Sequence, residues 1–221
     1  MLFNLATIEE DLRGFQQNFS SINDGLAMRR EDITDTMVNQ IVEAYGFLND
    51  LLRRKIDLFT PAGLHSLLEI NHIVLCGKDP KTRRQYYQHL TETRAGFVRK
   101  ITPIKQWVLK KRASNNPYKL ATGFYSRMLS QPQLFLEGNH RTGNILLNYL
   151  LLSKQAIPYV ISTDTAKPYL DLSGDIKFSD KGNSFDATVR LPGHSKRFRQ
   201  FLESNASDRY IVLADQAGRK H

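Results

Sequence analysis

One stretch in the middle of the chain combines residue types that can hold phosphate. It reads Ser-Gln-Pro-Gln-Leu-Phe-Leu-Glu-Gly-Asn-His-Arg-Thr-Gly-Asn and spans residues 130–144. Gly138 and Asn139, just before an expected helix start, can point backbone N–H groups outward, and the positive end of the helix dipole favours an anion there. Arg141 adds a planar guanidinium that suits phosphate oxygens. Glu137 is placed to hold a divalent cation that bridges phosphates. Together these residues outline a triphosphate site.

The same residues also fit an ordinary helix–loop–helix turn with Glu137 and Arg141 as a surface pair. The wider pattern favours the phosphate site, because Phe-Leu-Glu-Gly-Asn-His-Arg-Thr-Gly-Asn resembles the active-site loop of the Fic (Fido) domain family. That family's pattern is His-Pro-Phe-x-Asp/Glu-Gly-Asn-Gly-Arg-x-x-Arg, and residues 130–144 are similar to a divergent bacterial branch of it. The resemblance extends over residues 34–160 and implies a Fic-like helical bundle.

The resemblance also implies a role for individual residues. Glu137 matches the acid that holds magnesium, Gly138 and Asn139 match the start of the phosphate-binding loop, and Arg141 matches its first arginine. Phe135 matches the aromatic residue that packs beneath the loop. Members of the family typically transfer a nucleoside monophosphate, as in AMPylation, from a nucleoside triphosphate to a Ser, Thr or Tyr hydroxyl of another protein. The implied cofactors are therefore Mg²⁺ and ATP or another nucleotide, and the implied partner is a protein target.

Three positions of the loop depart from the family pattern. Glutamine replaces the histidine that takes the hydroxyl proton: Gln133 at the family spacing, or Gln131 if a two-residue insertion keeps the following proline. An amide cannot accept a proton near neutral pH, and general-base catalysis contributes roughly 10²–10⁴-fold in rate. His140 replaces the third loop glycine. Asn144 replaces the second arginine, which removes a contact to the far phosphate and is compatible with a shorter-tailed or differently oriented ligand. In the Doc branch a lysine at the position of His140 accompanies transfer of a terminal phosphate.

An imidazole titrates near neutrality, so His140 is our candidate for a displaced acid or base and for a phosphate contact. The alternative is that its ring packs on a neighbouring helix. The sequence thus leaves open a nucleotidyltransferase, a catalytically inactive nucleotide-binding regulatory module and a phosphoryl transferase of Doc type. A nucleic-acid-binding protein is a further alternative.

A second segment interleaves basic and aromatic side chains, namely Arg83, Arg84, Tyr86, Tyr87, His89 and Arg94. Such a segment can stack on single-stranded nucleic acid. It also occupies the region where Fic proteins carry the flap that docks the target's backbone, and it is equally compatible with a solvated helix face. If nucleic acid were the ligand, Lys110, Lys111 and Arg112 would contribute too.

A third segment, from Ser20 to Gly25, bears on regulation. Many Fic proteins are held inactive by a Ser/Thr-x-x-x-Glu-Gly/Asn segment, and this one has Asp24 in place of the glutamate. In the family that glutamate pairs with the second arginine, which is Asn144 here. The resemblance leaves self-inhibition open beside an ordinary capped turn.

Helical signals surround the loop on both sides. Thr34 is a candidate N-cap for a helix to about residue 55, and Thr60 with Pro61 starts another that Gly77 ends. We expect a helix, or a helix plus loop, over residues 81–100 and a short helix over 103–112. Asn116 and Pro117 open a further helix that Pro132 ends. Residues 142–155 are apolar on nearly all sides, which predicts a helix at the centre of the core.

The C-terminal part of the chain has a different pattern of apolar residues. Alternating apolar residues from 176 to 191 flank the turn signal Lys181-Gly182-Asn183 and predict a small hairpin. Residues 195–204 are expected to be helical, and residues 157–162 and 210–214 extended. The expected fold class is therefore mainly α, with small β-hairpin or extended elements in the C-terminal part. The expected division is an N-terminal segment 1–33 that packs on the core, a Fic-like core 34–160 and a C-terminal α/β extension 161–221.

Composition narrows the class of protein. The chain has 221 residues with 41% apolar side chains, which excludes a disordered chain. A single cysteine excludes an intramolecular disulfide and fits a reducing compartment. No apolar run approaches the roughly 20 residues that span a bilayer, and no secretory signal is read, so we expect a cytoplasmic protein without a membrane partner. A homodimer is left open.

The formal net charge is +9, and it is unevenly distributed. Residues 51–150 hold 17 basic and 5 acidic residues, whereas residues 1–50 hold 3 basic and 9 acidic residues. The positive excess therefore lies in the segment that contains the loop, where it would attract a nucleotide or an acidic protein. Nucleic acid becomes the alternative partner.

Overall fold

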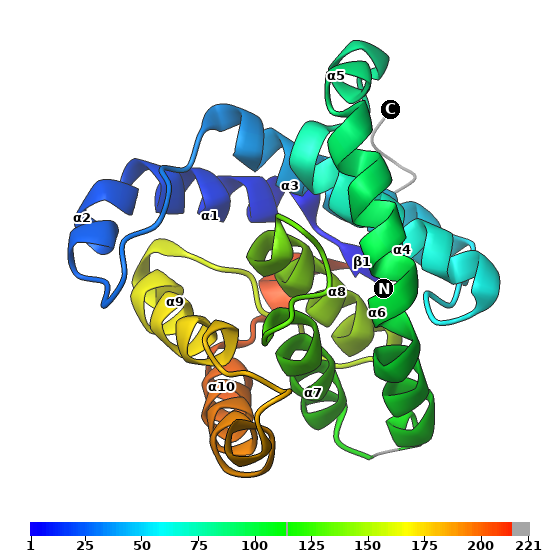
Figure 1. Ribbon diagram of the computed structural model, residues 1–221. Helices are drawn as coiled ribbons and strands as arrows, with labels where there is room; N and C mark the ends of the chain where they lie inside the picture. The colour runs from blue at the N-terminus through cyan, green and yellow to red at the C-terminus, as the bar shows by residue number, and fades with distance from the viewer. Residues whose placement is uncertain (114, 214–221) are drawn as a thin grey trace.

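The computed structural model describes residues 1–113 and 115–213, and it is mainly helical (Figure 1). Its elements in chain order are β1 (Leu2–Phe3), α1 (Leu5–Gln17), α2 (Phe19–Asp24), α3 (Asp35–Arg53), α4 (Pro61–Cys76), α5 (Pro80–Gln85), α6 (Tyr87–Lys111), α7 (Pro117–Leu129), α8 (Asn139–Ser153), α9 (Thr163–Lys177), a π-helical turn (Asp186–Arg190), α10 (Leu191–Asn205), a 3₁₀ turn (Asp208–Tyr210) and β2 (Ile211–Val212). The expected fold class, mainly α with a small β element, is confirmed. No helix among these residues is long and apolar enough to cross a membrane.

Helix α8 is the central element of the fold. It packs on α3, α4 and α7, which surround it in Figure 1. Every residue from 145 to 152 is buried, as the apolar sequence predicted. The one amide in this run, Asn148, is fully satisfied: its Nδ2 donates to Tyr45 Oη at 2.8 Å and to Tyr159 O at 2.7 Å, and its Oδ1 accepts from Tyr159 N. Satisfied in this way, Asn148 does not weaken the core.

The helix starts that the sequence predicted are confirmed by their capping bonds. Thr34 Oγ1 accepts from Met37 N at 3.2 Å, and Thr60 Oγ1 accepts from Gly63 N at 3.1 Å. Asn116 caps α7 in the same way, by accepting from Lys119 N at 2.7 Å. Each cap satisfies a backbone donor that the first helical turn leaves free. The start of α8 was predicted too late, because the helix begins at Asn139 rather than at residue 142.

The basic stretch after α4 forms two helices, and its end differs from the expectation. A short α5 is followed by α6, whose 25 residues run through Pro103 to Lys111. The short helix expected over 103–112 is therefore the last part of α6. Apolar side chains at Phe97, Ile101, Ile104 and Val108 keep one face buried on both sides of the proline. This continuous apolar face keeps α6 helical through Pro103, at the position where sequence signals favoured a break.

The hairpin expected over residues 176–191 is wrong. Ile176 is buried within α9, and residues 186–205 form the π-helical turn and α10. The alternating apolar residues do not share a face, because Phe185 and Val189 are each 55% exposed whereas Ile176 is fully buried. An alternating pattern indicates a strand when its apolar side chains are buried together on one face. These side chains are not buried together.

The sheet of the described chain joins its two ends. Strand β1 pairs antiparallel with β2, with Leu2 opposite Val212 and Phe3 opposite Ile211. The extended structure expected over residues 210–214 is thus present at 211–212, and residue 214 lies outside the described residues. The sequence did not predict the partner strand at residues 2–3. Both edges of β1 are used, since Asn49 Oδ1 accepts from Phe3 N at 2.7 Å and Asn49 Nδ2 donates to Phe3 O.

A single cluster of buried apolar side chains runs through all three expected segments. It includes Phe3 and Leu12 near the N-terminus, Leu147 in α8, and Tyr169 and Phe198 in the C-terminal part. The three segments share this core, and the division at residues 33 and 160 stays a prediction.

Candidate functional site

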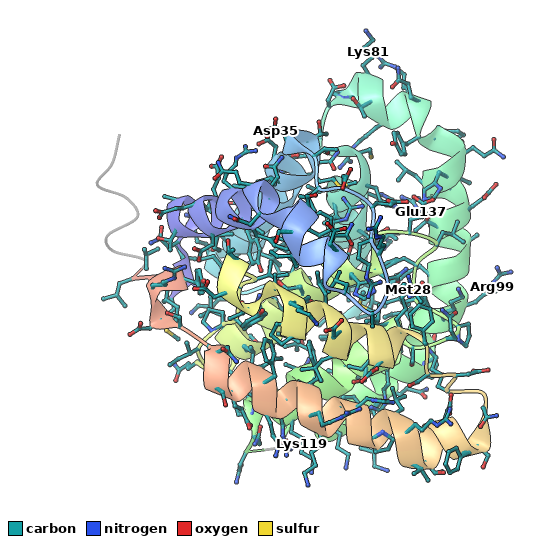
Figure 2. All side chains as sticks on the ribbon, turned by 90° about the vertical axis from the view of Figure 1, so that its left-hand side faces the viewer. Met28, Asp35, Lys81, Arg99, Lys119 and Glu137 are labelled. Atoms are coloured by element: carbon teal, nitrogen blue, oxygen red, sulfur yellow. The ribbon has the colours of Figure 1, made fainter. Side chains whose placement is uncertain are left out.

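The predicted loop joins α7 to α8 at the mouth of a cavity of about 520 Å³. Glu137, Gly138, His140, Arg141 and Asn144 all line this cavity. Its inner wall is apolar and comes mainly from α1, α3 and α9. The segment between α2 and α3, residues 25–34, also contributes to its wall, and we call this segment the strap. Figure 2 shows Met28 of the strap and Glu137 of the loop on the same face of the molecule.

Asn139 holds the loop in shape from inside. Its Oδ1 accepts from Phe135 N at 3.0 Å, and its Nδ2 donates to Phe135 O at 3.0 Å and to Gln133 Oε1 at 3.4 Å. The side chain is only 5% exposed, so it is a structural clamp on the loop. Phe135 is buried beneath the loop, where it stacks on Phe97 with ring centroids 5.7 Å apart.

Gly138 sets the direction of the chain into α8. Its φ is +72°, the left-handed region that glycine adopts without steric cost. A Cβ at this position would meet Asn71 Nδ2 and Leu75 Cδ2 at 3.2 Å. No side chain caps the helix that follows, so the first-turn N–H groups remain available to a ligand. Asn71 supports the turn by donating from Nδ2 to Glu137 O at 3.0 Å and to Thr142 Oγ1 at 3.1 Å.

Arg141 and Glu137 place opposite charges at the cavity mouth. Arg141 Nη1 donates to Val74 O at 3.2 Å, which orients the half-buried guanidinium. Burial lowers the pKa of Arg141, while Glu31 and Glu137 raise it, and arginine stays cationic at any physiological pH. Glu137 is exposed. No ion pair between Glu137 and Arg141 forms in the described chain, so the surface pair considered from sequence is not observed.

His140 lies in a cationic environment. Its Nε2 is 3.5 Å from Arg30 Nη1. Burial, together with the nearby charges of Arg30 and Lys177, lowers the pKa of His140 to about 3. The ring is therefore neutral near pH 7, and it is a far weaker base than an ordinary histidine. Its Nδ1 is buried and has no hydrogen-bond partner among residues 1–113 and 115–213.

The two glutamines occupy different places. Gln133 lines the cavity, and its amide is engaged with Leu129 O at 3.1 Å and with Asn139. Gln131 is exposed and is not one of the cavity-lining residues. Its backbone pairs instead with the C-terminal part, through Gln131 N to Ser179 O at 2.9 Å and Lys181 N to Gln131 O at 3.0 Å. Of the two, only Gln133 is placed to meet a ligand.

Asn144 belongs to a buried polar network. Its Oδ1 accepts from Tyr45 Oη at 3.2 Å and from Asn148 Nδ2 at 3.3 Å. The residue also lines the cavity. It adds no charge, so a cationic contact to the distal part of a ligand must come from another element.

The C-terminal part fixes the loop from behind. Lys181 Nζ donates to Arg127 O at 2.7 Å, to Ser130 O at 3.0 Å and to Pro132 O at 2.7 Å. Burial and the charge of Lys100 lower the pKa of Lys181 to about 8. One ammonium group therefore satisfies three carbonyls where α7 ends and the loop begins.

Of the other segments noted from sequence, the basic-aromatic one approaches the site at Tyr86, which acts on the charge of Arg141. Asp24 pairs with Arg29 at 2.7 Å rather than with a residue of the loop, and it does not line the cavity. Arg83 pairs with Glu69 at 2.7 Å. Self-inhibition by the segment from Ser20 to Gly25 stays a prediction. So does the role of the basic-aromatic segment as a flap that docks a target protein.

Two residues of the site could not be found from sequence. Arg30 in the strap and Lys177 at the end of α9 line the cavity with the loop. Arg30 is 110 positions away from His140, its hydrogen-bonding neighbour. The available signal was an Arg-Arg pair within the acidic first 50 residues, and nothing linked that pair to the loop.

The cavity offers few metal-ligating side chains. Among the described residues no group of three or more His, Cys, Asp or Glu side chains could hold a metal. Glu31 and Glu137 are the carboxylates among the residues that line the cavity, and Mg²⁺ is commonly held by one or two carboxylates together with phosphate oxygens.

Comparison of the chain with protein-family models, with curated proteins and with solved structures finds no match. The resemblance to the Fic family accordingly rests on the residues of the loop and on the helices that carry them.

Proposed function

We propose that the protein is a Fic-like nucleotide-binding protein whose α7–α8 loop holds the phosphates of a nucleoside triphosphate. One observation carries the proposal. Glu137, the uncapped N-terminus of α8 and Arg141 line the mouth of the same cavity. Each of the three suits a different part of a metal–phosphate ligand. An ordinary surface turn does not require the three together.

Each residue of the site has a definite task under this proposal. The first-turn N–H groups of α8 receive phosphate oxygens, and Gly138 allows the chain to approach them closely. Arg141 adds a charge-assisted contact, with its orientation fixed by Val74 O. Glu137 would hold Mg²⁺, which supplies neutralisation of the phosphate charge when it is bound. The apolar inner wall suits the less polar part of the ligand.

The geometry favours binding over transfer. Gln133 is held by Leu129 O and Asn139, Gln131 is outside the cavity, and His140 is a weak base. A hydroxyl nucleophile would therefore meet no efficient general base in this site. A catalytically inactive regulatory module is therefore the function that the geometry supports best. Nucleotidyl or phosphoryl transfer is the alternative, and labelled nucleotides distinguish the two.

Titration calorimetry tests the binding step. ATP, GTP, CTP and UTP, each with MgCl₂, are titrated into the wild-type protein, the Arg141→Ala variant and the Arg99→Ala variant. Arg99 is a matched control, because it projects from α6 into solvent (Figure 2). We expect Arg141→Ala to weaken binding by about 10- to 100-fold, since a hydrogen bond to a charged group contributes about 1.5–3 kcal/mol. Equal affinity in all three proteins would refute the proposal.

Labelled nucleotides test the transfer step. The protein is incubated with a cell lysate and with nucleotides labelled at the α- or the γ-phosphate. Absence of labelled protein supports the binding module. Label from the α-phosphate that depends on Glu137 would establish a nucleotidyltransferase, and label from the γ-phosphate would establish a phosphoryl transferase.

Nucleic acid is a less favoured partner. Lys81, Arg99 and Lys119 are three exposed basic residues that lie at separate edges of the molecule in Figure 2. Affinity for single-stranded nucleic acid that falls steeply with salt and depends on Arg83 and Arg84, but not on Arg141, would favour that alternative.

A further inference from the structure

A second group of cations lines the cavity away from the loop motif. Arg30 reaches it from the strap, and Lys177 reaches it from the end of α9. Neither belongs to residues 130–144, and neither forms an ion pair within 4 Å among the described residues. Together with Arg141 and with Arg29 of the strap, they give the walls of one cavity four cationic side chains.

Arg30 is held in place through its backbone. Arg30 N donates to Asn23 Oδ1 at 2.7 Å, and Asn23 Nδ2 donates to Arg30 O at 3.0 Å. The side chain then passes over Gly174, where an added Cβ would be 3.1 Å from Arg30 Nη2. The same Nη2 donates to Leu170 O at 3.3 Å. The backbone of the strap and the small residue in α9 thus direct a guanidinium toward His140.

Polar atoms at this point are left without partners. Arg30 Nε and His140 Nδ1 are both buried, and neither has a hydrogen-bond partner among residues 1–113 and 115–213. A buried polar group without a partner destabilises the folded protein. Such groups are uncommon unless a ligand or water satisfies them, and here two of them lie on residues that touch one another.

The charges at this point are also incompletely balanced. Burial lowers the pKa of both His140 and Lys177, and the charge of Arg30 lowers both further, because positive charge is concentrated there. Glu31 of the strap raises the pKa of Lys177 and of Arg141, so it is the acidic residue that acts on both sides of the cavity. It forms no ion pair with either cation within 4 Å in the described chain. An anion between Arg30 and Lys177 would relieve the repulsion.

We propose that Arg30, His140 and Lys177 form a second anion subsite, and that the cavity takes a ligand with two or more linked phosphates. This proposal rests on the proposed function, because the first phosphate occupies the loop at Gly138–Arg141. The second subsite supplies the cationic contact that Asn144 does not provide. Under this proposal the strap is part of the binding site. The preferred ligand is a di- or triphosphate rather than a monophosphate.

The test compares ligands that differ in phosphate number. AMP, ADP, ATP, inorganic phosphate and pyrophosphate are titrated into the wild-type protein and into the Arg30→Ala, Arg30→Lys and Lys177→Ala variants. Arg99→Ala is the control, because Arg99 is an exposed arginine of α6 that does not line the cavity. Circular dichroism and thermal unfolding are used to check that each variant is folded.

We expect Arg30→Ala to weaken ADP, ATP and pyrophosphate by about tenfold or more, with AMP and phosphate changed by less than about twofold. Lys177→Ala should have the same selectivity, and Arg30→Lys should retain part of the affinity because it keeps the charge. Arg99→Ala should match the wild type.

Other results would overturn the inference. If Arg30→Ala changed AMP and ATP equally, or changed neither, Arg30 would have a structural role only. If Arg141→Ala had no effect while pyrophosphate still depended on Arg30, the proposed function would fail and the second subsite would stand. If neither ATP nor pyrophosphate bound the wild-type protein, both would be wrong.

Discussion

At the scale of single residues, His140 illustrates how surroundings decide what a side chain can do. The sequence marked it as a substitute acid or base because an ordinary imidazole titrates near neutrality. In the fold, desolvation and two neighbouring cations favour the neutral ring and lower its pKa to about 3. What remains is a hydrogen-bonding group beside Arg30, which is a different role in the same site.

The protonation state of His140 gives a first prediction. We expect no titration of the His140 ring between pH 5 and 8 in a histidine NMR experiment. Replacing either neighbouring cation, by Arg30→Ala or Lys177→Ala, should raise its pKa. His194, which is 3.3 Å from Asp175 at the surface, is a second histidine to follow in the same spectra. A His140 midpoint near 6.5 in the wild-type protein would contradict the prediction.

The same shift has a consequence for stability. The folded state binds the His140 proton only near pH 3, whereas the unfolded state binds it near 6.5. The unfolded state therefore takes up more protons between these values, and the free energy of unfolding falls as the pH is lowered from about 6.5 to about 3. Urea unfolding of the His140→Asn variant should show a shallower dependence on pH over this range than the wild type does.

Asn139 is the residue whose loss should disturb the loop most. Asn139→Ala removes both bonds to the backbone of Phe135 and leaves a buried N–H and C=O without partners. We expect the free energy of unfolding to fall by about 2–4 kcal/mol. The Gln133→Ala variant is the control: it removes the 3.4 Å bond to Asn139 and the 3.1 Å bond to Leu129 O but leaves both bonds to Phe135, so its loss should be smaller than that of Asn139→Ala. Equal losses in urea unfolding would argue against the clamp.

At the scale of elements, the junction between the loop and α8 depends on one backbone conformation. Gly138→Ala places a Cβ at a φ of +72° and against Asn71 and Leu75. We expect a loss of about 1–2 kcal/mol in the free energy of unfolding. Gly96→Ala in α6 is the matched control: nothing lies within 4 Å of its added Cβ, so it should be neutral or stabilising by about 0.5–1 kcal/mol. The opposite order of the two variants in urea unfolding would refute this account.

The elements also show which structural features the sequence could predict. The starts of α3, α4 and α7 were predictable because Thr34, Thr60 and Asn116 form bonds to backbone groups three residues away. The hairpin prediction was wrong because the alternating residues of the C-terminal part differ in burial, and burial depends on α7 and α10. Local bonds are visible in a sequence, and packing between distant segments is not.

The residues of the candidate site also differ in whether the sequence could reveal them. Glu137 through Asn144 were found because they are contiguous and share one pattern. Arg30 and Lys177 could not be found, since they meet His140 only through the packing of the strap and α9. The role of Lys181 behind the loop was hidden for the same reason, because it reaches back about 50 positions to the end of α7.

At the scale of the whole molecule, the first and last segments of the described residues are joined to the core. Strand β1 pairs with β2, and Arg209 and Tyr210 both contact Asp11 of α1. Helix α1 packs on α3 and α9, so it connects the loop-bearing segment to the C-terminal part. The cavity lies among these same elements. The walls of the site therefore exist only when the N-terminal, central and C-terminal segments are assembled.

This arrangement predicts that the central segment will not fold alone. A chain of residues 34–160 would keep α3 to α8 but would expose the apolar faces that Leu12, Tyr169 and Phe198 cover. Burial of each such side chain contributes roughly 1.5–3 kcal/mol, and a domain is stable by only about 5–15 kcal/mol. We expect the full chain to unfold in one cooperative transition in urea, and the 34–160 fragment to show none under the same conditions. A fragment that unfolds cooperatively with full helical circular dichroism would mean that the core is divisible, and that the strap and α9 are additions to a self-sufficient loop-bearing domain.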